Sequence, residues 1–202
     1  DDLGTLLEDV AWPQEDRADA LRLLQTFLDA QLHLPEWAEL QEPLVRDLAR
    51  TADPLMALRN FHRYAAAVFN QSSFFRLLTQ NTEHRAFLTT LLASSQLMAD
   101  IVVRSPEYLE WCFAEADLNQ VKPVERYVQQ LSDFVRRHKS QEARQRALCR
   151  FKRRELLRMG VRDLLGKGTL DDFCRELTHL AEAACDLALR DTWQEVVARH
   201  GF

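Results

Sequence analysis

Residues 173–187 read FCRELTHLAEAACDL, and the spacing of the apolar side chains in this stretch decides the fold class. These side chains follow one another in alternating steps of four and three residues: Phe173, Leu177, Leu180, Ala184 and Leu187. The pattern predicts an α-helix that packs lengthwise against its neighbours. Beyond residue 187 the apolar positions rotate gradually around the helix. This rotation is expected when a straight helix continues past a heptad repeat. These positions are Leu189, Trp193 and Val196.

The whole chain has the composition of a helical protein. Of its 202 residues, 47% are hydrophobic, and there are only 5 Gly and 6 Pro. Strong helix formers are abundant and runs of β-branched residues are scarce. The sequence therefore predicts an all-α fold, a multi-helix bundle with a long C-terminal helix. Helices are expected near 16–33, 36–50, 54–70, 73–80, 83–93, 95–104, 106–113, 123–138, 141–166 and 170–199.

Two domains are expected along this helical chain. Residues 1–50 are predicted to form an N-terminal helical extension, and residues 51–202 a helical domain. Residues 114–122, AEADLNQVK, are the most loop-like stretch inside the second domain. Several helix starts carry N-cap signals, in which a short polar side chain precedes the first turn. The predicted caps include Asp53, Thr82, Ser140 and Thr169.

Cysteine usage and apolar runs predict a cytoplasmic protein. The cysteines have no C-x-x-C or zinc-finger spacing and mostly apolar neighbours, so buried reduced thiols are expected, as in a reducing cytosol; they are Cys112, Cys149, Cys174 and Cys185. The start, DDLGTLLEDVAWP, does not have the pattern of a signal peptide. Residues 86–103 are the least charged stretch, but their Ser and Thr side chains and Asp100 predict buried core rather than a membrane span.

Basic residues gather in one segment of this acidic chain. From residue 136 to residue 162 there are 11 Lys and Arg against two acids, whereas the rest holds 15 basic and 29 acidic residues, for a net charge of -5. Residues 150–166 of this segment read RFKRRELLRMGVRDLLG. On a helical wheel of about 100° per residue, four arginines fall in one row: Arg150, Arg154, Arg158 and Arg162. Like charges in such a row repel and weaken an isolated helix.

This arginine row, with its neighbours, supplies the interaction candidates of the sequence. Glu155 lies beside the row and can pair with Arg158. The full set is Arg150, Arg154, Arg158, Arg162, Glu155, Lys152 and Arg153. Three interpretations are open: a bridge to acidic faces of the same chain, a docking face for an acidic partner, and a nucleic-acid contact. The first is favoured because most carboxylates lie elsewhere in this chain, and the last is disfavoured because the row has no interleaved aromatic residues.

Motifs for catalysis do not emerge from the sequence. The phosphate-binding patterns G-x-x-x-x-G-K-[ST] and G-x-G-x-x-G, the metalloprotease pattern H-E-x-x-H and the hydrolase pattern G-x-S-x-G are all missing. Gly166-Lys167-Gly168 follows a predicted helix instead of a strand, which indicates a C-cap and a turn. No catalytic, cofactor-binding or metal-binding residue is predicted, and no cofactor is expected for this chain by itself.

Four blocks of sequence carry a resemblance to a known family. They are ALRNFHRYAAAVFN (57–70), LMADIVVRSPEYLEWCF (97–113), ALCRFKRRELLRMGVRDLLG (147–166) and LDDFCRELTHLAEAACDLAL (170–189). In order and spacing they resemble the N-terminal helical region of glutamine synthetase adenylyltransferase, the bifunctional adenylyltransferase and adenylyl-removing enzyme of bacterial nitrogen assimilation. The resemblance spans roughly residues 55–200.

The resemblance implies a reaction that this chain does not have the motif to perform. Family members transfer AMP from ATP to a tyrosine of glutamine synthetase and remove it by phosphorolysis. They do so in nucleotidyltransferase domains with Gly-Lys-Leu-Gly-Gly and Ser-Asp-x-Asp segments that hold Mg²⁺. Neither segment is present here, and residues 198–202, ARHGF, correspond to the region just before such a domain. The chain is therefore expected to be a non-catalytic scaffold or docking segment of a nucleotidyltransferase.

The resemblance also implies partners, and the residues keep an alternative open. The implied partners are the following nucleotidyltransferase domain, glutamine synthetase and the P-II signalling protein; neither nucleic acid nor a membrane is expected. The alternative is a stand-alone helical adaptor that binds a protein through its basic helix face.

Charge reversal of the arginine row separates an internal bridge from a docking face. If the row meets carboxylates of its own chain, replacing Arg154 and Arg158 with Glu should lower the melting temperature by several degrees. If it is a docking face, the melting temperature should hold while partner binding is lost. Thermal unfolding followed by circular dichroism is the measurement.

Overall fold

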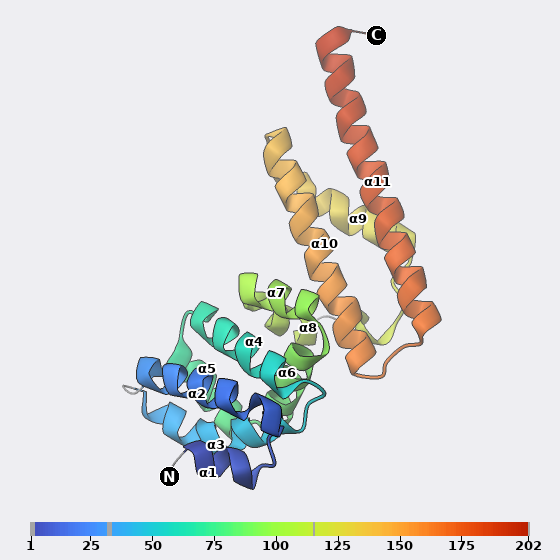
Figure 1. The fold of residues 1–202 in the computed structure, drawn as a ribbon. Coiled ribbons are helices and arrows are strands. Elements are labelled where there is room, and N and C mark those ends of the chain that lie inside the picture. Colours follow the sequence, from blue (N-terminus) through green and yellow to red (C-terminus); the bar gives the residue numbers. More distant parts are fainter. Residues whose placement is uncertain (1–2, 32–33, 115, 202) are drawn as a thin grey trace. The chain divides into compact units, whose positions relative to one another are not determined.

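The computed structural model describes residues 3–31, 34–114 and 116–201, and every regular element in these ranges is helical (Figure 1). The α-helices are α1 (Leu3–Asp9), α2 (Arg17–Gln31), α3 (Pro35–Ala49), α4 (Pro54–Ala67), α5 (Gln71–Gln80), α6 (Thr82–Ser94), α7 (Gln96–Arg104), α8 (Glu107–Ala114), α9 (Val124–Val135), α10 (Gln141–Leu164) and α11 (Leu170–His200). Two short 3-10 helices, η1 (Gln14–Asp16) and η2 (Ala116–Asn119), complete the order. The predicted all-α fold with a long C-terminal helix is confirmed.

The ten predicted helices are all present among the described residues, and one helix there was missed; residues 32–33, at the end of the predicted helix 16–33, lie outside the described residues. α1 has only seven residues, fewer than two turns, so it shows no clear apolar period. It exists because Leu3 and Leu7 are buried, and the helix packs against α2 and α3. The stretch 114–122, predicted as a loop, contains the 3-10 turn η2, and its residue 115 lies outside the described residues.

Side-chain caps start several helices where the sequence placed them. Asp53 accepts a hydrogen bond from the backbone N of Met56 at 2.9 Å, and Ser140 and Thr169 cap α10 and α11 in the same way. The prediction for Thr82 is wrong by one residue. Asn81 caps α6, because its side chain accepts from the backbone N of His84 and Thr82 already belongs to the helix.

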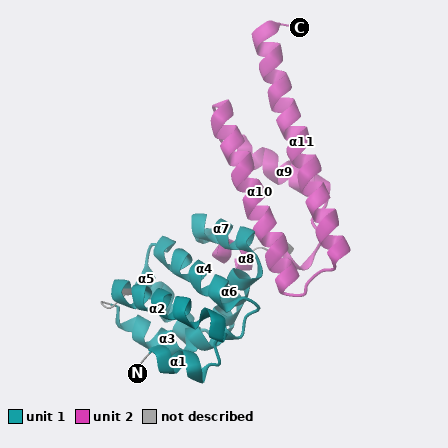
Figure 2. Ribbon diagram, in the orientation of Figure 1, with its two compact units in different colours: residues 1–107 teal, residues 108–202 magenta. Residues whose placement is uncertain are grey.

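The chain divides into two units, residues 1–107 and 108–202 (Figure 2). The boundary that the sequence suggested, after residue 50, falls inside the first unit, where α3 packs against α5 and α6. Which of these segments are independent domains stays a prediction.

The core of the first unit contains an aromatic cluster to which four helices contribute rings, with Phe27 packed against a ring from each of the other three. Phe27 of α2 lies 4.4 Å from Trp37 of α3, 5.9 Å from Phe61 of α4 and 6.0 Å from Phe75 of α5, measured between ring centroids. All four rings are buried. Edge-to-face contacts at these distances add stability beyond the area that they bury.

α6 and α7 carry the apolar stretch that the sequence placed in the core. Leu88, Leu91 and Leu92 of α6 and Ile101 and Val102 of α7 are buried. Within the described residues, no single helix is long and apolar enough to cross a membrane. α6 and α7 reach the required length and composition only as a pair, with a bend of 120° between them.

The second unit is built around α9, α10 and α11, which pack against one another (Figure 1). Its apolar core has contributions from all three helices: Tyr127, Leu131, Val135, Ala147, Phe151, Met159, Leu180 and Ala183. Beyond this core the apolar side chains in the second half of α11 are exposed, with Leu189 at 69% and Trp193 at 61% of their full accessibility. α11 therefore packs along its first half and presents apolar side chains to solvent along its second.

The cysteine prediction is right for one residue and wrong for three. None of the four cysteines, all of which the structure describes, forms a disulfide, and Cys112 is buried. Cys149, Cys174 and Cys185 are exposed, because each falls on a side of α10 or α11 that faces away from the core of the unit. Apolar sequence neighbours do not bury a helical residue, since neighbours in sequence point in different directions.

Glu36 gives the first unit a specific acid sensitivity. Its carboxylate accepts hydrogen bonds from Ser72 at 2.6 Å and from Arg76 at 2.7 Å, which lowers its pKa from 4.5 to about 2. The stabilisation from a lowered pKa is complete above pH 4.5 and is lost as the pH falls toward 2. Urea midpoints measured between pH 5 and pH 2 should therefore fall less steeply for Glu36→Gln than for the parent chain. Glu42→Gln, on the exposed side of the same helix, is the control and should follow the parent; equal slopes for all three proteins would contradict the prediction.

Candidate functional site

The structure distributes the arginine row over three different environments of α10. A step of four residues advances about 40° beyond one full helical turn, so three steps rotate the row by about 120°. Arg150, at the start of the row, is partly exposed, and its Nη2 lies 3.2 Å from Nε2 of His138. Arg158 and Arg162, at the other end, are buried. A row that is continuous on the wheel therefore passes from the outer side of the helix into the core.

Arg154, between these extremes, lies among aromatic rings. Its guanidinium carbon is 4.3 Å from the ring centre of Trp111, 5.1 Å from that of Phe151 and 5.4 Å from that of Phe134. Its Nη2 also donates to Glu155 at 3.3 Å. Cations at such distances are attracted to the ring faces. Arg154 thus links α8, which carries Trp111, to α9 and α10.

Arg158 and Glu155 form the centre of a buried ion network. Arg158 Nε donates to Glu155 Oε2 at 2.9 Å, and the ammonium of Lys122 reaches the same oxygen at 2.9 Å. The side chains of all three residues have no accessible surface. Lys122 also donates to the side chain of Gln130 at 3.0 Å. Glu155, a single carboxylate, therefore neutralises part of the charge of two buried cations.

Glu176 of α11 supplies the second carboxylate of the network. Its Oε1 accepts from Arg158 Nη2, and its Oε2 accepts from Arg162 Nη1 at 3.2 Å. Arg162 also lies 3.7 Å from Asp172. A methyl group on Gly168 would come within 2.8 Å of the Arg162 guanidinium, so the glycine leaves room for this side chain.

The network also holds the segment that precedes α9. The backbone N of Lys122 donates to Glu176 at 2.8 Å, and Nδ1 of His179 donates to the Lys122 carbonyl at 3.0 Å. The Tyr127 hydroxyl accepts from Arg158 at 2.8 Å and donates to Glu176 at 3.4 Å. The buried ion network is therefore one connected group that joins the loop before α9 to α9, α10 and α11: Lys122, Tyr127, Glu155, Arg158, Arg162 and Glu176.

Burial and charge act together on the pKa values of this network. Burial alone would raise the pKa of Glu155, but Lys122 and Arg158 outweigh it and hold that pKa below the usual range. Burial dominates at Tyr127 and raises the pKa of its hydroxyl. Burial opposes the charge of Arg158, yet Tyr127, Glu155 and Glu176 raise its pKa overall. Tyr127 is thus neutral, and Glu155 and Arg158 are charged, at neutral pH.

Sequence reasoning missed three members of the network: Lys122, Tyr127 and Glu176. The apolar pattern selected Leu177 for the packed face of α11, but Leu177 is 40% exposed and its neighbour Glu176 is buried. Glu176 also fits the steps of three and four between Phe173 and Leu180, so the spacing allowed it and only its charge argued against it. Lys122 lies just after η2, where the chain showed no periodicity.

The remaining candidates lie outside this network. Lys152 is exposed and Arg153 is partly exposed, both on α10. The Gly166-Lys167-Gly168 segment ends α10 as expected: Gly166 has φ 64°, and its backbone N donates to Asp163 O at 2.9 Å.

The carboxylates of the network are not arranged to hold Mg²⁺. All four oxygens of Glu155 and Glu176 accept hydrogen bonds from protein donors, and four cations surround them. Among the described residues, no group of three or more His, Cys, Asp or Glu side chains could hold a metal ion. A metal pair of the kind that nucleotidyltransfer uses therefore does not fit these side chains.

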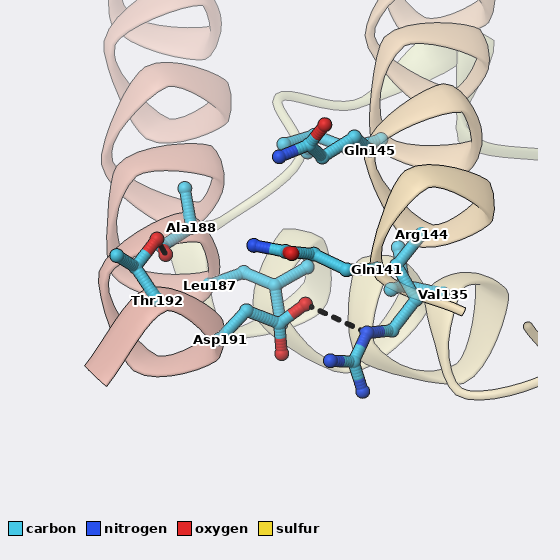
Figure 3. A pocket seen from close by; sticks show the side chains of 9 residues that line it. Val135, Gln141, Arg144, Gln145, Leu187, Ala188, Asp191 and Thr192 are labelled. Carbon is cyan, nitrogen blue, oxygen red and sulfur yellow. Dashed lines mark hydrogen bonds and ion pairs between the residues drawn. The ribbon is translucent and has the colours of Figure 1, made fainter. Parts of the chain in front are cut away.

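A cleft between α10 and α11 is too small for a metabolite. Gln141 and Gln145 point from α10 toward α11 across it, and Arg144 Nε lies 3.2 Å from Asp191 at its edge (Figure 3). Its volume is about 50 Å³. Small-molecule pockets are commonly about 300–1,000 Å³, so this cleft has room for one or two waters.

These features define an all-helical protein whose second unit is organised by an internal ion network. Residues 85–202 match the family described as glutamate-ammonia ligase adenylyltransferase, and the chain belongs to this family. Glutamate-ammonia ligase is glutamine synthetase, so the family that the four sequence blocks indicated is confirmed. The matched residues begin in α6 and include the whole second unit.

Substitutions of two neighbouring residues of α11 test how much the buried ion network contributes to stability. Glu176→Ala should lower the free energy of unfolding by about 3–5 kcal/mol, because it leaves Arg158 and Arg162 buried without their shared carboxylate. Leu177→Ala, one position away, should cost less than about 1 kcal/mol because the side chain is half-exposed. Urea unfolding followed by circular dichroism measures both. Equal losses, or a larger loss for Leu177→Ala, would contradict the burial of Glu176.

Proposed function

We propose that this chain is a non-catalytic helical scaffold of a glutamine synthetase adenylyltransferase and deadenylylase. The observation that supports it is the complete use of Glu155 and Glu176 by buried cations, which leaves the central carboxylates of the second unit with a structural task. In this proposal ATP and Mg²⁺ are bound by a separate nucleotidyltransferase domain. The chemistry of AMP transfer and removal takes place there.

A scaffold needs a stiff element, and α11 has the required properties. It has 31 residues, and at about 1.5 Å per residue it is about 45 Å long. A capping box formed by Thr169 and Asp172 starts it, and Glu176 and His179 attach its first turns to the rest of the unit. Its first half is therefore held in one orientation, which suits a support for another domain.

The docking part of the proposal concerns glutamine synthetase and the P-II signalling protein. A scaffold of this family brings its catalytic domain to the synthetase, so contact with the synthetase is part of the proposed role. The alternative, a stand-alone helical adaptor, is supported by basic side chains that remain on the outer side of α10, such as Lys152.

The scaffold proposal predicts that the chain has no AMP chemistry of its own. Purified residues 1–202, incubated with ATP, Mg²⁺ and glutamine synthetase, should transfer no radiolabelled AMP above the level of synthetase alone. With phosphate and adenylylated synthetase they should release none. A complete adenylyltransferase of the family is the positive control. AMP transfer or release that follows the chain through gel filtration would contradict the proposal.

A further inference from the structure

The outer side of the first half of α10 is a basic surface that the ion network does not use. A depression of about 370 Å³ lies there, lined by Glu142, Gln145, Arg146, Cys149, Arg150 and Arg153. We call these six residues the basic face. Residues at such steps of three and four lie on one side of a helix. The basic face is thus about two to three helical turns long.

Most cations of the segment 136–162 have carboxylate partners, but those of the basic face largely do not. Arg136 pairs with Asp133, Arg144 pairs with Asp191, and Arg158 and Arg162 pair inside the network. On the basic face, Arg146 pairs with Glu142.

Two arginines of the basic face have no carboxylate partner within the described part of the chain. Across the described part of the chain, Arg150 and Arg153 form no ion pair with a carboxylate, and neither does the adjacent Lys152. Glu142 is the single acid among the six residues of the face. The face therefore carries net positive charge on a chain whose net charge is -5.

The spacing of these cations fits a helix as the partner. Arg146, Arg150 and Arg153 lie at positions i, i+4 and i+7, which repeat along one side of α10. A second helix packed alongside would meet them with carboxylates at the same steps, and guanidinium groups bind carboxylates through paired hydrogen bonds. Cys149, a small exposed residue between them, leaves room for the partner backbone.

Nucleic acid fits this face less well. No aromatic side chain lines it for stacking with bases, and Glu142 would repel phosphates. The acidic remainder of the chain would further oppose a long polyanion. The complementary surface is therefore short and carries separate carboxylates.

We propose that the basic face of α10 binds an acidic helical segment of a partner protein, with Arg150 and Arg153 as its principal contacts. An acidic helix is the kind of partner expected if the chain docks another protein, so this proposal rests on the docking role in the proposed function. Its failure would leave the scaffold role intact, because the AMP assay tests that role separately.

A designed peptide tests the proposal directly on the 202-residue chain. The probe is an alanine-based peptide of about 18 residues, long enough to form a helix in water, with Glu at i, i+4 and i+7 on one side. A matched peptide has Gln at these positions. Binding is measured by fluorescence anisotropy at low salt, and the Glu peptide should bind at least about tenfold more tightly than the Gln peptide. Equal binding of the two peptides would overturn the proposal.

Charge reversals locate the contact. Arg150→Glu with Arg153→Glu should weaken binding of the Glu peptide about tenfold or more. Arg175→Glu with Arg190→Glu makes the same change of charge at exposed positions of α11 and should weaken it less than threefold. Similar losses for both pairs would show attraction to the overall charge of the chain and would overturn the proposal. Thermal unfolding of each variant confirms that it is folded before binding is measured.

Thiol alkylation supplies a second readout at the face itself. In a chain with Cys174→Ser and Cys185→Ser, Cys149 is the remaining exposed thiol of those that the structure describes. Bound Glu peptide should slow its reaction with iodoacetamide several-fold, and the Gln peptide should not. An unchanged rate at saturating Glu peptide would place the binding elsewhere. A short single-stranded RNA that protects Cys149 more strongly than the peptide would also overturn the choice of an acidic protein.

Discussion

The contact of Arg158 with Glu155 and Glu176 is the constraint on which the second unit depends. One guanidinium joins two carboxylates from different helices, and each carboxylate holds a further cation, Lys122 or Arg162. Removing any one charged member would leave its partner as a buried charge, which costs far more than a surface pair is worth. The positions of α10, α11 and the loop before α9 are therefore linked.

A buried network of this kind fixes register more than it adds stability. Apolar side chains of similar size could fill the same space at equal or lower free energy. Hydrocarbon contacts, however, tolerate a helix that slides or rotates, whereas Glu176 meets both arginines in only one register of α11 against α10. The apolar core around Phe151 and Leu180 supplies the attraction, and the charges select one arrangement of it. This selection suits the proposed role as a scaffold.

The arginine-rich helix α10 places its arginines in different environments that its sequence does not separate. Arg158 and Arg162 are internal, Arg154 lies against three aromatic rings, and Arg150 reaches the outer side. All four were predicted as one row because a helical wheel shows a single helix and none of the helices that pack against it. The slow rotation of an i,i+4 row, about 40° per step, carries it from one environment to the next. The docking role of the outer residues stays a prediction that charge reversal can test.

The sequence alone determined the helical class, the ten longer helices, most caps and the family, because these depend on local spacing and on ordered blocks of residues. Tertiary structure decided which charged residues are internal. Glu176 lies inside and Leu177 outside, although hydrophobicity argues for the reverse, because the buried guanidinium groups of Arg158 and Arg162 need a carboxylate at that position. Such a preference arises only when segments distant in the chain, here Lys122, α10 and α11, come together, and no local pattern contains it.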